Sequence, residues 1–297
     1  TRFNLLETFV KASPLLLTGL AVAFAFRAKF WNIGAEGQLL AGALTATVLG
    51  IYLKSVPAAL VLPMVIVGGF LAGGLWAFIP AILKTKLKVD DVVSSLLLNY
   101  VMIHIMGALL FGPLQQPGSS WPRSSEIIAA AKYPILMPRS RFHMGVLIAL
   151  LAVLVIWFIN NKTTFGYQNK AVGMNLRAAR FGGIRTNAVI LWTALISGGL
   201  AGLAGVGELC ALQYRLIMDL SPGYGYSGIV IAMLGNLHPV GVLFSSLFFS
   251  IIIVGAQTMS RMTGVPVYIA EVIQGMALMI MLIFLLFTEY RVRVVRK

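Results

Sequence analysis

The sequence predicts an all-α protein that crosses a lipid bilayer many times. Of its 297 residues, 59% are hydrophobic and only 11% are charged, and the mean hydropathy is +0.91. A soluble domain needs far more polar surface than this composition supplies. The apolar residues gather into long runs, and a helix of about 20 residues crosses the hydrocarbon layer. We therefore expect a single domain over residues 1–297, built as a bundle of about eight to nine transmembrane or re-entrant helices.

Eight apolar runs are long enough, or nearly long enough, to span. They cover residues 12–30, 37–53, 56–81, 92–111, 144–160, 187–213, 240–258 and 267–288. A further apolar piece, 226–236, is too short to span alone unless the bilayer thins around it or the segment is re-entrant. Clusters of Pro and Gly punctuate these runs at 55–57, 112–122, 221–228 and 263–266.

The basic residues predict the orientation of the chain. Lys and Arg gather at 84–88, at 162–185 and at 291–297, next to the ends of apolar runs. The positive-inside rule places all three groups in the cytoplasm. We expect a cytoplasmic loop at 161–186, an external loop at 112–143 and a cytoplasmic C-terminus, with 226–236 counted as a crossing. Residues 1–11 then lie outside, as expected if one more helix precedes this sequence. The net charge of +14 follows this topology rather than nucleic-acid binding.

One stretch between the first two runs is unusually polar. "FWNIGAEGQLLAGA", residues 30–43, carries Asn32, Glu36 and Gln38 among its glycines. Gly34 and Gly37 permit a break in the helix, Asn32 suits the cap of the next helix, and Glu36 suits its positive end. Two interpretations stay open. The stretch is either a discontinuous element beside a transport path or a well-capped turn between two helices.

Four stretches of the chain resemble a known family. They are "TGLAVAFAFRAKFWNIGAEGQLLAGA" (18–43), "KLKVDDVVSSLLLNY" (86–100), "AVGMNLRAARFGGI" (171–184) and "SPGYGYSGIVIAMLGNLHPVGVL" (221–243). Together they resemble the permease subunits of ABC importers for nucleosides and simple sugars, in particular those that work with a Bmp-like lipoprotein receptor. Lys29 and Trp31 depart from the Gly and Phe that are common in that family. Members usually carry one more N-terminal helix, which agrees with the topology above.

The stretch 171–184 predicts a short helix in a basic loop. Ala171, Met174, Ala178 and Phe181 recur at helical spacing, and Gly173 and Gly182 lie near the two ends. The resemblance implies that this element is the coupling helix, which docks on the nucleotide-binding subunit. The alternative is an amphipathic helix on anionic headgroups. The residues expected to make the docking contact are Ala171, Gly173, Met174, Asn175, Ala178, Ala179, Phe181 and Gly182.

Nothing in the sequence predicts catalysis or a metal site. There is no G-x-x-x-x-G-K-[ST] phosphate loop, so ATP and magnesium are expected on partner subunits and no cofactor is expected on this chain. The three His residues show no metal-binding spacing, and the single Cys210 lies in an apolar run. Small-xxx-small pairs predict close helix packing instead, at Gly69 and Gly73, Gly198 and Gly202, and Ala201 and Gly205.

Polar residues within or near the apolar runs are candidates for a translocation path. A polar side chain in hydrocarbon is costly unless it is paired or wetted, so each is a functional candidate by default. The alternative is an interhelical hydrogen bond, or a carboxylate paired with Arg215 or Arg261. Aromatic rings of Trp192, Tyr214, Tyr224 or Tyr226 are able to stack on a base, but Trp and Tyr also populate membrane interfaces generally. The expected path residues are Asn32, Glu36, Gln38, Asn99, Glu208, Gln213, Gln257, Glu271 and Gln274.

The resemblance implies the translocation subunit of an ATP-driven importer in a bacterial plasma membrane. Its expected partners are a second permease, a cytoplasmic ATPase, an external substrate-binding lipoprotein and membrane lipid. Nucleosides are the expected solute, and simple sugars are an alternative. A second alternative is an ion-coupled carrier in which Glu36, Glu208 or Glu271 couples solute to protons or sodium. A docking helix at 171–184 favours the importer, because a carrier does not need one.

Overall fold

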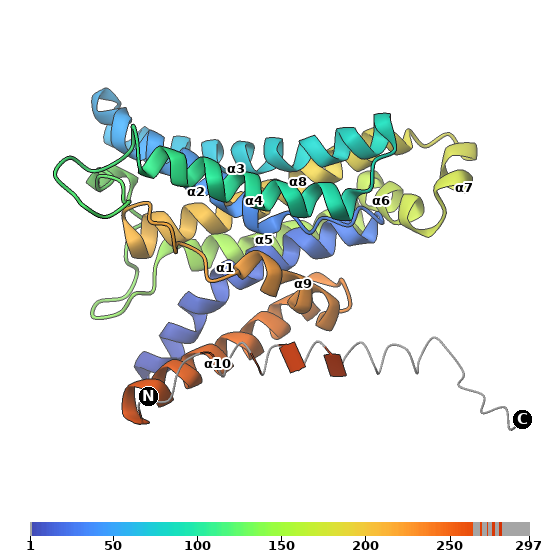
Figure 1. Cartoon of the computed structure of the whole chain (residues 1–297). Helices are drawn as coiled ribbons and strands as arrows, with labels where there is room; N and C mark the ends of the chain where they lie inside the picture. Colours follow the sequence, from blue (N-terminus) through green and yellow to red (C-terminus); the bar gives the residue numbers. More distant parts are fainter. Residues whose placement is uncertain (1, 264–267, 269–271, 273–274, 277–278, 281–297) are drawn as a thin grey trace, which may run out of the picture.

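A computed structural model confirms the all-α prediction. It describes residues 2–263, 268, 272, 275–276 and 279–280. These residues form ten α-helices and no named strand (Figure 1). The helices are α1 (Arg2–Arg27), α2 (Ala35–Tyr52), α3 (Ala58–Ile82), α4 (Asp91–Leu110), α5 (Met144–Lys162), α6 (Thr164–Met174), α7 (Leu176–Phe181), α8 (Thr186–Glu208), α9 (Tyr224–Leu234) and α10 (Pro239–Thr263).

Within the described residues, seven helical segments are long and apolar enough to cross a membrane. Each corresponds to a predicted run, but the boundaries move. The first helix begins at Arg2 rather than near residue 12, and the short piece at 226–236 becomes α9. The predicted run 267–288 falls mainly outside the described residues. Membrane helices therefore dominate the fold, as the composition predicts.

The bundle has two distinct ends (Figure 1). The segment 112–143 lies at one end, and α6 and α7 lie at the other. The chain returns from the first end to the second through 214–234, as an irregular segment followed by the short α9. At the first end, the Ser124 N–H donates to the Leu216 carbonyl at 2.9 Å. At the second, Asn236 and Leu237 share a pocket with Arg27 of α1. The segment 214–234 thus runs from one end of the bundle to the other, which the orientation argument requires.

The segment 112–143 closes over its end of the bundle by backbone pairing. The Ile127 N–H donates to the Tyr214 carbonyl at 3.0 Å, and the Tyr133 N–H donates to the Cys210 carbonyl at 2.8 Å. Glu126 accepts from both Lys132 and Arg215. The hydrogen bond from Lys132, joined by that from Arg215, holds the pKa of the Glu126 carboxyl below its ordinary value. Arg215, one of the two cations considered for an intramembrane carboxylate, is therefore engaged outside the bundle.

Glycines bring α2, α3 and α8 into backbone contact. A Cβ at Gly202 of α8 would collide with the Gly69 carbonyl of α3, and one at Gly42 of α2 would collide with the Gly202 carbonyl. A Cβ at Gly205 would meet the Leu39 carbonyl of α2. The small-xxx-small pairs predicted from the sequence therefore lie at a real three-helix contact. Close approach of this kind supplies the van der Waals contact that holds helices together in lipid.

Gly202→Ala tests this contact. We expect it to lower the melting temperature of the purified protein, because the new methyl group must push α3 away from α8. Gly207→Ala in the same helix is the matched control, because no atom lies within 4 Å of its added Cβ. The control should be neutral or slightly stabilising, since Ala favours a helix by up to about 1 kcal/mol over Gly. Equal effects of the two substitutions in a thermal melt would contradict the packing.

Candidate functional site

The polar stretch after α1 is an irregular backbone segment in which buried residues alternate with the exposed Lys29 and Trp31. The first helix ends at Arg27 and α2 begins at Ala35. Between them Phe30 and Asn32 are fully buried. Backbone N–H and C=O groups at such a position need partners, because neither lipid nor a helix satisfies them. The predicted break is therefore present, at 28–34.

One face of α4 supplies many of these partners. The Trp31 N–H donates to Asp91 Oδ2 at 2.6 Å, and the Ile33 N–H donates to Ser95 Oγ at 3.1 Å. Asn99 Nδ2 donates to the Ile33 carbonyl at 3.0 Å, and the Gly37 N–H donates to Asn99 Oδ1 at 2.8 Å. Asp91, Ser95 and Asn99 are spaced by four residues, so they share one helix face. Sequence reasoning selected only Asn99, although this spacing could have revealed all three.

The Asp91 carboxylate is itself paired. Lys84 Nζ lies 2.6 Å from Asp91 Oδ2 and donates to the Lys29 carbonyl, also at 2.6 Å. The Asp91 side chain is only 7% exposed. Burying a carboxylate is costly unless a cation and hydrogen-bond donors pair with it. Lys84 thereby fastens the end of α3 to the corner after α1.

Asn32 and Gln38 bind one another and α8. Asn32 Nδ2 donates to Gln38 Oε1 at 2.9 Å and to Ser197 Oγ at 3.0 Å. Gln38 Nε2 donates back to Asn32 Oδ1 at 2.7 Å, and the same oxygen accepts from the Gly34 N–H at 3.1 Å. Ser197 in turn donates to the Ala21 carbonyl at 2.7 Å. The N-cap position of α2 is occupied by Gly34, so the expected N-cap role of Asn32 is wrong. Asn32 instead accepts a hydrogen bond from the N–H of Gly34.

Glu36 lies in the first turn of α2, as predicted, but it also serves a second helix. Its Oε2 accepts from the Gly225 N–H, in the first turn of α9, at 2.7 Å. A carboxylate is favourable at the N-terminus of a helix. Thr18 of α1 donates to the Tyr224 carbonyl at 3.0 Å. Two side chains from α1 and α2 thus fix the start of α9.

Gly37 does not break the helix. It lies inside α2, and a Cβ there would sit 3.0 Å from the Asn99 Cα of α4. Its role is close approach between two helices, so the expected break at this residue is wrong. Gly34 marks the end of the irregular segment.

The remaining path candidates are not brought together. Glu208 is buried at the end of α8, where the Tyr224 hydroxyl, Lys11 and Arg141 interact with it. Gln213 is exposed, and Gln257 is partly buried on α10. Arg215, one of the two cations considered as partners of an intramembrane carboxylate, binds Gln116 and Glu126 instead. Glu271 and Gln274 lie outside the described residues.

The stretch 171–184 is two helices rather than one. Asn175 has an extended backbone between α6 and α7, and its Oδ1 caps α7 by accepting from the Arg177 and Ala178 N–H groups at 3.0 Å each. Asx residues favour such a cap over helix continuation. Phe181 is 97% exposed and Met174 is 73% exposed. Ala178 and Gly182 are also exposed, and Ala171 is partly buried.

Two residues expected to contact a partner are buried in this chain instead. Ala179 is buried, and a Cβ at Gly173 would collide with the Arg27 carbonyl of α1. Gly173 therefore lets α6 rest on the end of α1. Both residues pack within this chain rather than protrude from it.

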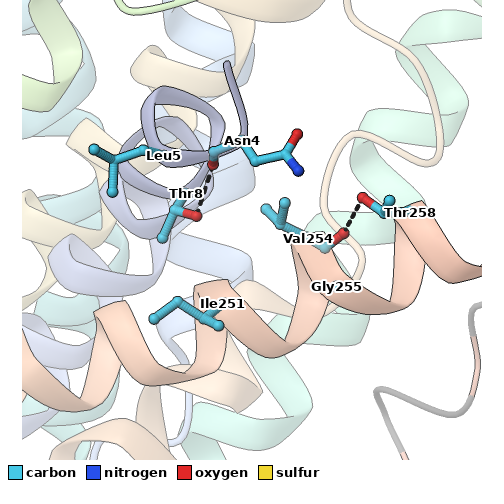
Figure 2. A pocket seen from close by; sticks show the side chains of 7 residues that line it. All are labelled: Asn4, Leu5, Thr8, Ile251, Val254, Gly255 and Thr258. Atoms are coloured by element: carbon cyan, nitrogen blue, oxygen red, sulfur yellow. Dashed lines mark hydrogen bonds between the residues drawn. The ribbon is translucent and has the colours of Figure 1, made fainter. Parts of the chain in front are cut away.

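A pocket of 430 Å³ lies between the start of α1 and the end of α10 (Figure 2). The hydroxyls of Thr8 and Thr258 are bonded back to carbonyls of their own helices, at 2.9 and 2.8 Å. Apart from these and Asn4, its lining residues have no polar side chain. A site for a polar solute needs several converging polar groups. This pocket therefore does not define a solute site.

Substitution of Glu36 tests its bond to α9. Glu36→Gln keeps an oxygen that accepts from the Gly225 N–H, whereas Glu36→Leu leaves that buried N–H without a partner. We expect the Leu variant to be less stable than the Gln variant by about 1–3 kcal/mol. Denaturation of both purified variants measures the difference. Equal stability would show that the carboxylate does not hold the helix.

Comparisons with known proteins agree with this architecture. Residues 4–282 match the family model described as "Branched-chain amino acid transport system / permease component". A glucose ABC transporter permease of Haloferax volcanii is 36% identical, over 98% of this chain and 79% of that protein. A guanosine ABC transporter permease of Bacillus subtilis is also 36% identical, over 90% of this chain and 77% of that protein.

A nucleoside ABC transporter permease of Lactococcus lactis is 31% identical, over 90% of this chain and 76% of that protein. No solved structure matches the chain. The family match covers nearly the whole described bundle. It includes the break after α1, and also the helices α4, α7 and α9. The chain is therefore a multi-pass membrane protein that belongs to the branched-chain-type permease family of ABC transporters.

Proposed function

We propose that this chain is the translocation subunit of an ATP-driven importer of nucleosides. Among its relatives, one is named for guanosine and another for nucleosides, and both align over 90% of this chain. In this proposal the solute passes between this chain and a second permease, an external lipoprotein delivers it, and separate subunits bind and hydrolyse ATP with magnesium. The end that bears α6 and α7 faces the cytoplasm, as does the C-terminus.

The exposed α7 is the observation that carries the ATP-driven mechanism. Phe181 is 97% exposed at the end of the bundle, and Leu176 on the same helix is 40% exposed. A helix of six residues is too short to be stable alone, so the Asn175 cap and the buried Ala179 must hold it in place. An aromatic side chain presented on a held element is suited to anchor a protein partner. We propose that the nucleotide-binding subunit docks here.

Phe181→Glu tests this docking. We expect the purified permease to bind its nucleotide-binding subunit at least about thirtyfold more weakly, because a central aromatic anchor contributes about 2 kcal/mol or more. Phe111→Glu is the matched control, since Phe111 is 66% exposed at the opposite end of the bundle. Affinity of each variant for the ATPase subunit measures the effect. Unchanged affinity in Phe181→Glu would contradict the docking site.

Glu208 is our leading candidate for a residue that lines the path. The hydrogen bonds that hold the break after α1 already engage Asn32, Gln38 and Asn99. We therefore assign these three residues a structural role. Glu208 holds no part of the break, and it interacts electrostatically with Tyr224, Lys11 and the Glu7–Arg141 ion pair. A polar cluster of this kind suits an uncharged solute rich in hydroxyls and ring nitrogens.

Simple sugars are the second candidate solute, because one relative is named for glucose and aligns over 98% of this chain. Family membership disfavours the ion-coupled carrier.

Uptake by proteoliposomes separates these functions. The vesicles would contain the permease with its partner subunits and lipoprotein, and ATP would be supplied on the α7 side or withheld. We expect ATP-dependent accumulation of labelled guanosine in excess of labelled glucose. Preferential glucose accumulation would favour the sugar importer. Accumulation by this chain alone, driven by an ion gradient, would contradict the importer.

A further inference from the structure

A pocket of 310 Å³ lies at the α6 end of the bundle, where three parts of the chain meet. The end of α1 and its following turn form one wall, the end of α6 forms the second, and the turn between α9 and α10 forms the third. Its lining residues are Phe26, Arg27, Lys29, Lys170, Gly173, Met174, Asn236, Leu237 and His238. Lys29 belongs both to this pocket and to the break after α1, where its carbonyl accepts from Lys84.

The side chains that line this pocket include basic residues but no carboxylate. The basic residues are Arg27, Lys29 and Lys170. None of the three takes part in the ion pairs found among the described residues. Asp91 is committed to Lys84. Three basic residues that line one pocket without a carboxylate favour a positive potential, which attracts an anion.

The rest of the lining indicates which kind of anion fits. Phe26, Met174 and Leu237 give the pocket an apolar part beside its basic part. A free phosphate would use only the basic part. A phospholipid would use both, with its phosphate at the cations and its glycerol and first acyl carbons against the apolar side chains. Basic pockets between helix ends at the membrane boundary are suited to anionic headgroups.

We propose that this pocket binds the phosphate of an anionic phospholipid. The bound lipid would bridge α1, α6 and the α9–α10 turn. Gly173 rests on the Arg27 carbonyl at the same place, so the lipid would stabilise the joint that carries α7. This inference does not depend on the identity of the transported solute.

Binding of phosphatidylglycerol to the purified, delipidated chain tests the proposal, with phosphatidylcholine as the neutral comparison. Native mass spectrometry would count the lipids that stay bound. The test variant is Lys29→Gln with Lys170→Gln, because both side chains are exposed and their loss should spare the fold. The matched control is Lys162→Gln with Arg177→Gln, two exposed cations of the same end that do not line the pocket.

We expect the chain to prefer phosphatidylglycerol. The test variant should bind it about 25-fold more weakly, at about fivefold for each basic residue, and the control should change little. Equal loss in both variants, or no preference for the anionic lipid, would overturn the proposal. Displacement of the lipid by millimolar inorganic phosphate would assign the pocket to free phosphate instead. If the test variant lost only affinity for the ATPase subunit, the pocket would belong to that protein.

Discussion

The need to satisfy backbone hydrogen bonds away from water governs this structure. A helix satisfies its own N–H and C=O groups, but an irregular segment inside a membrane protein must find partners elsewhere. Two such segments enter this bundle, at 28–34 and at 214–223. Asp91, Ser95 and Asn99 serve the first, and Glu36 serves the first turn of the helix that follows the second. Each polar residue is costly alone and stabilising in its pairing.

These pairings link parts of the chain that are far apart in sequence. Asn99 also donates to the Tyr226 hydroxyl at 3.3 Å, so α4 reaches α9 through the same amide that holds the break. Glu36 joins α2 to α9, and Gly173 lets α6 rest on the end of α1. A continuous set of contacts therefore runs from α7, through α6 and the end of α1, to the break. Movement of α7 by a docked partner would act on this set first.

The sequence predicts the fold class and most helices well, because long apolar runs and small-xxx-small pairs report directly on membrane crossing and close packing. It also locates the break, since glycine and polar residues inside an apolar region are costly without a reason. The single helix expected at 171–184 is wrong because the Asn175 side chain caps a new helix, and this competes with helical spacing. Gly173 and Ala179 lie in the same stretch, and only the fold shows that they are buried.

Polar partners over long separations were harder to predict. Glu36 and Gly225 are 189 positions apart, and no local pattern pairs them. Asn32 and Ser197 are 165 positions apart and meet only after α8 packs on α1. The spacing of Asp91, Ser95 and Asn99 was a readable signal, but it does not say what the face binds. The family match identifies the chain as an ABC transporter permease. The geometry identifies which polar residues hold its helices together.

Hydrogen–deuterium exchange of the chain in lipid nanodiscs tests the central claim most directly. The account holds that side chains accept the hydrogen bonds of backbone N–H groups at the break and at the start of α9. The amides of Trp31, Ile33, Gly37 and Gly225 should therefore exchange orders of magnitude more slowly than those of the exposed loop around Gly118. Exchange at these amides as fast as in that loop would show that the break faces water, and that its polar residues line a wet path rather than hold the bundle together.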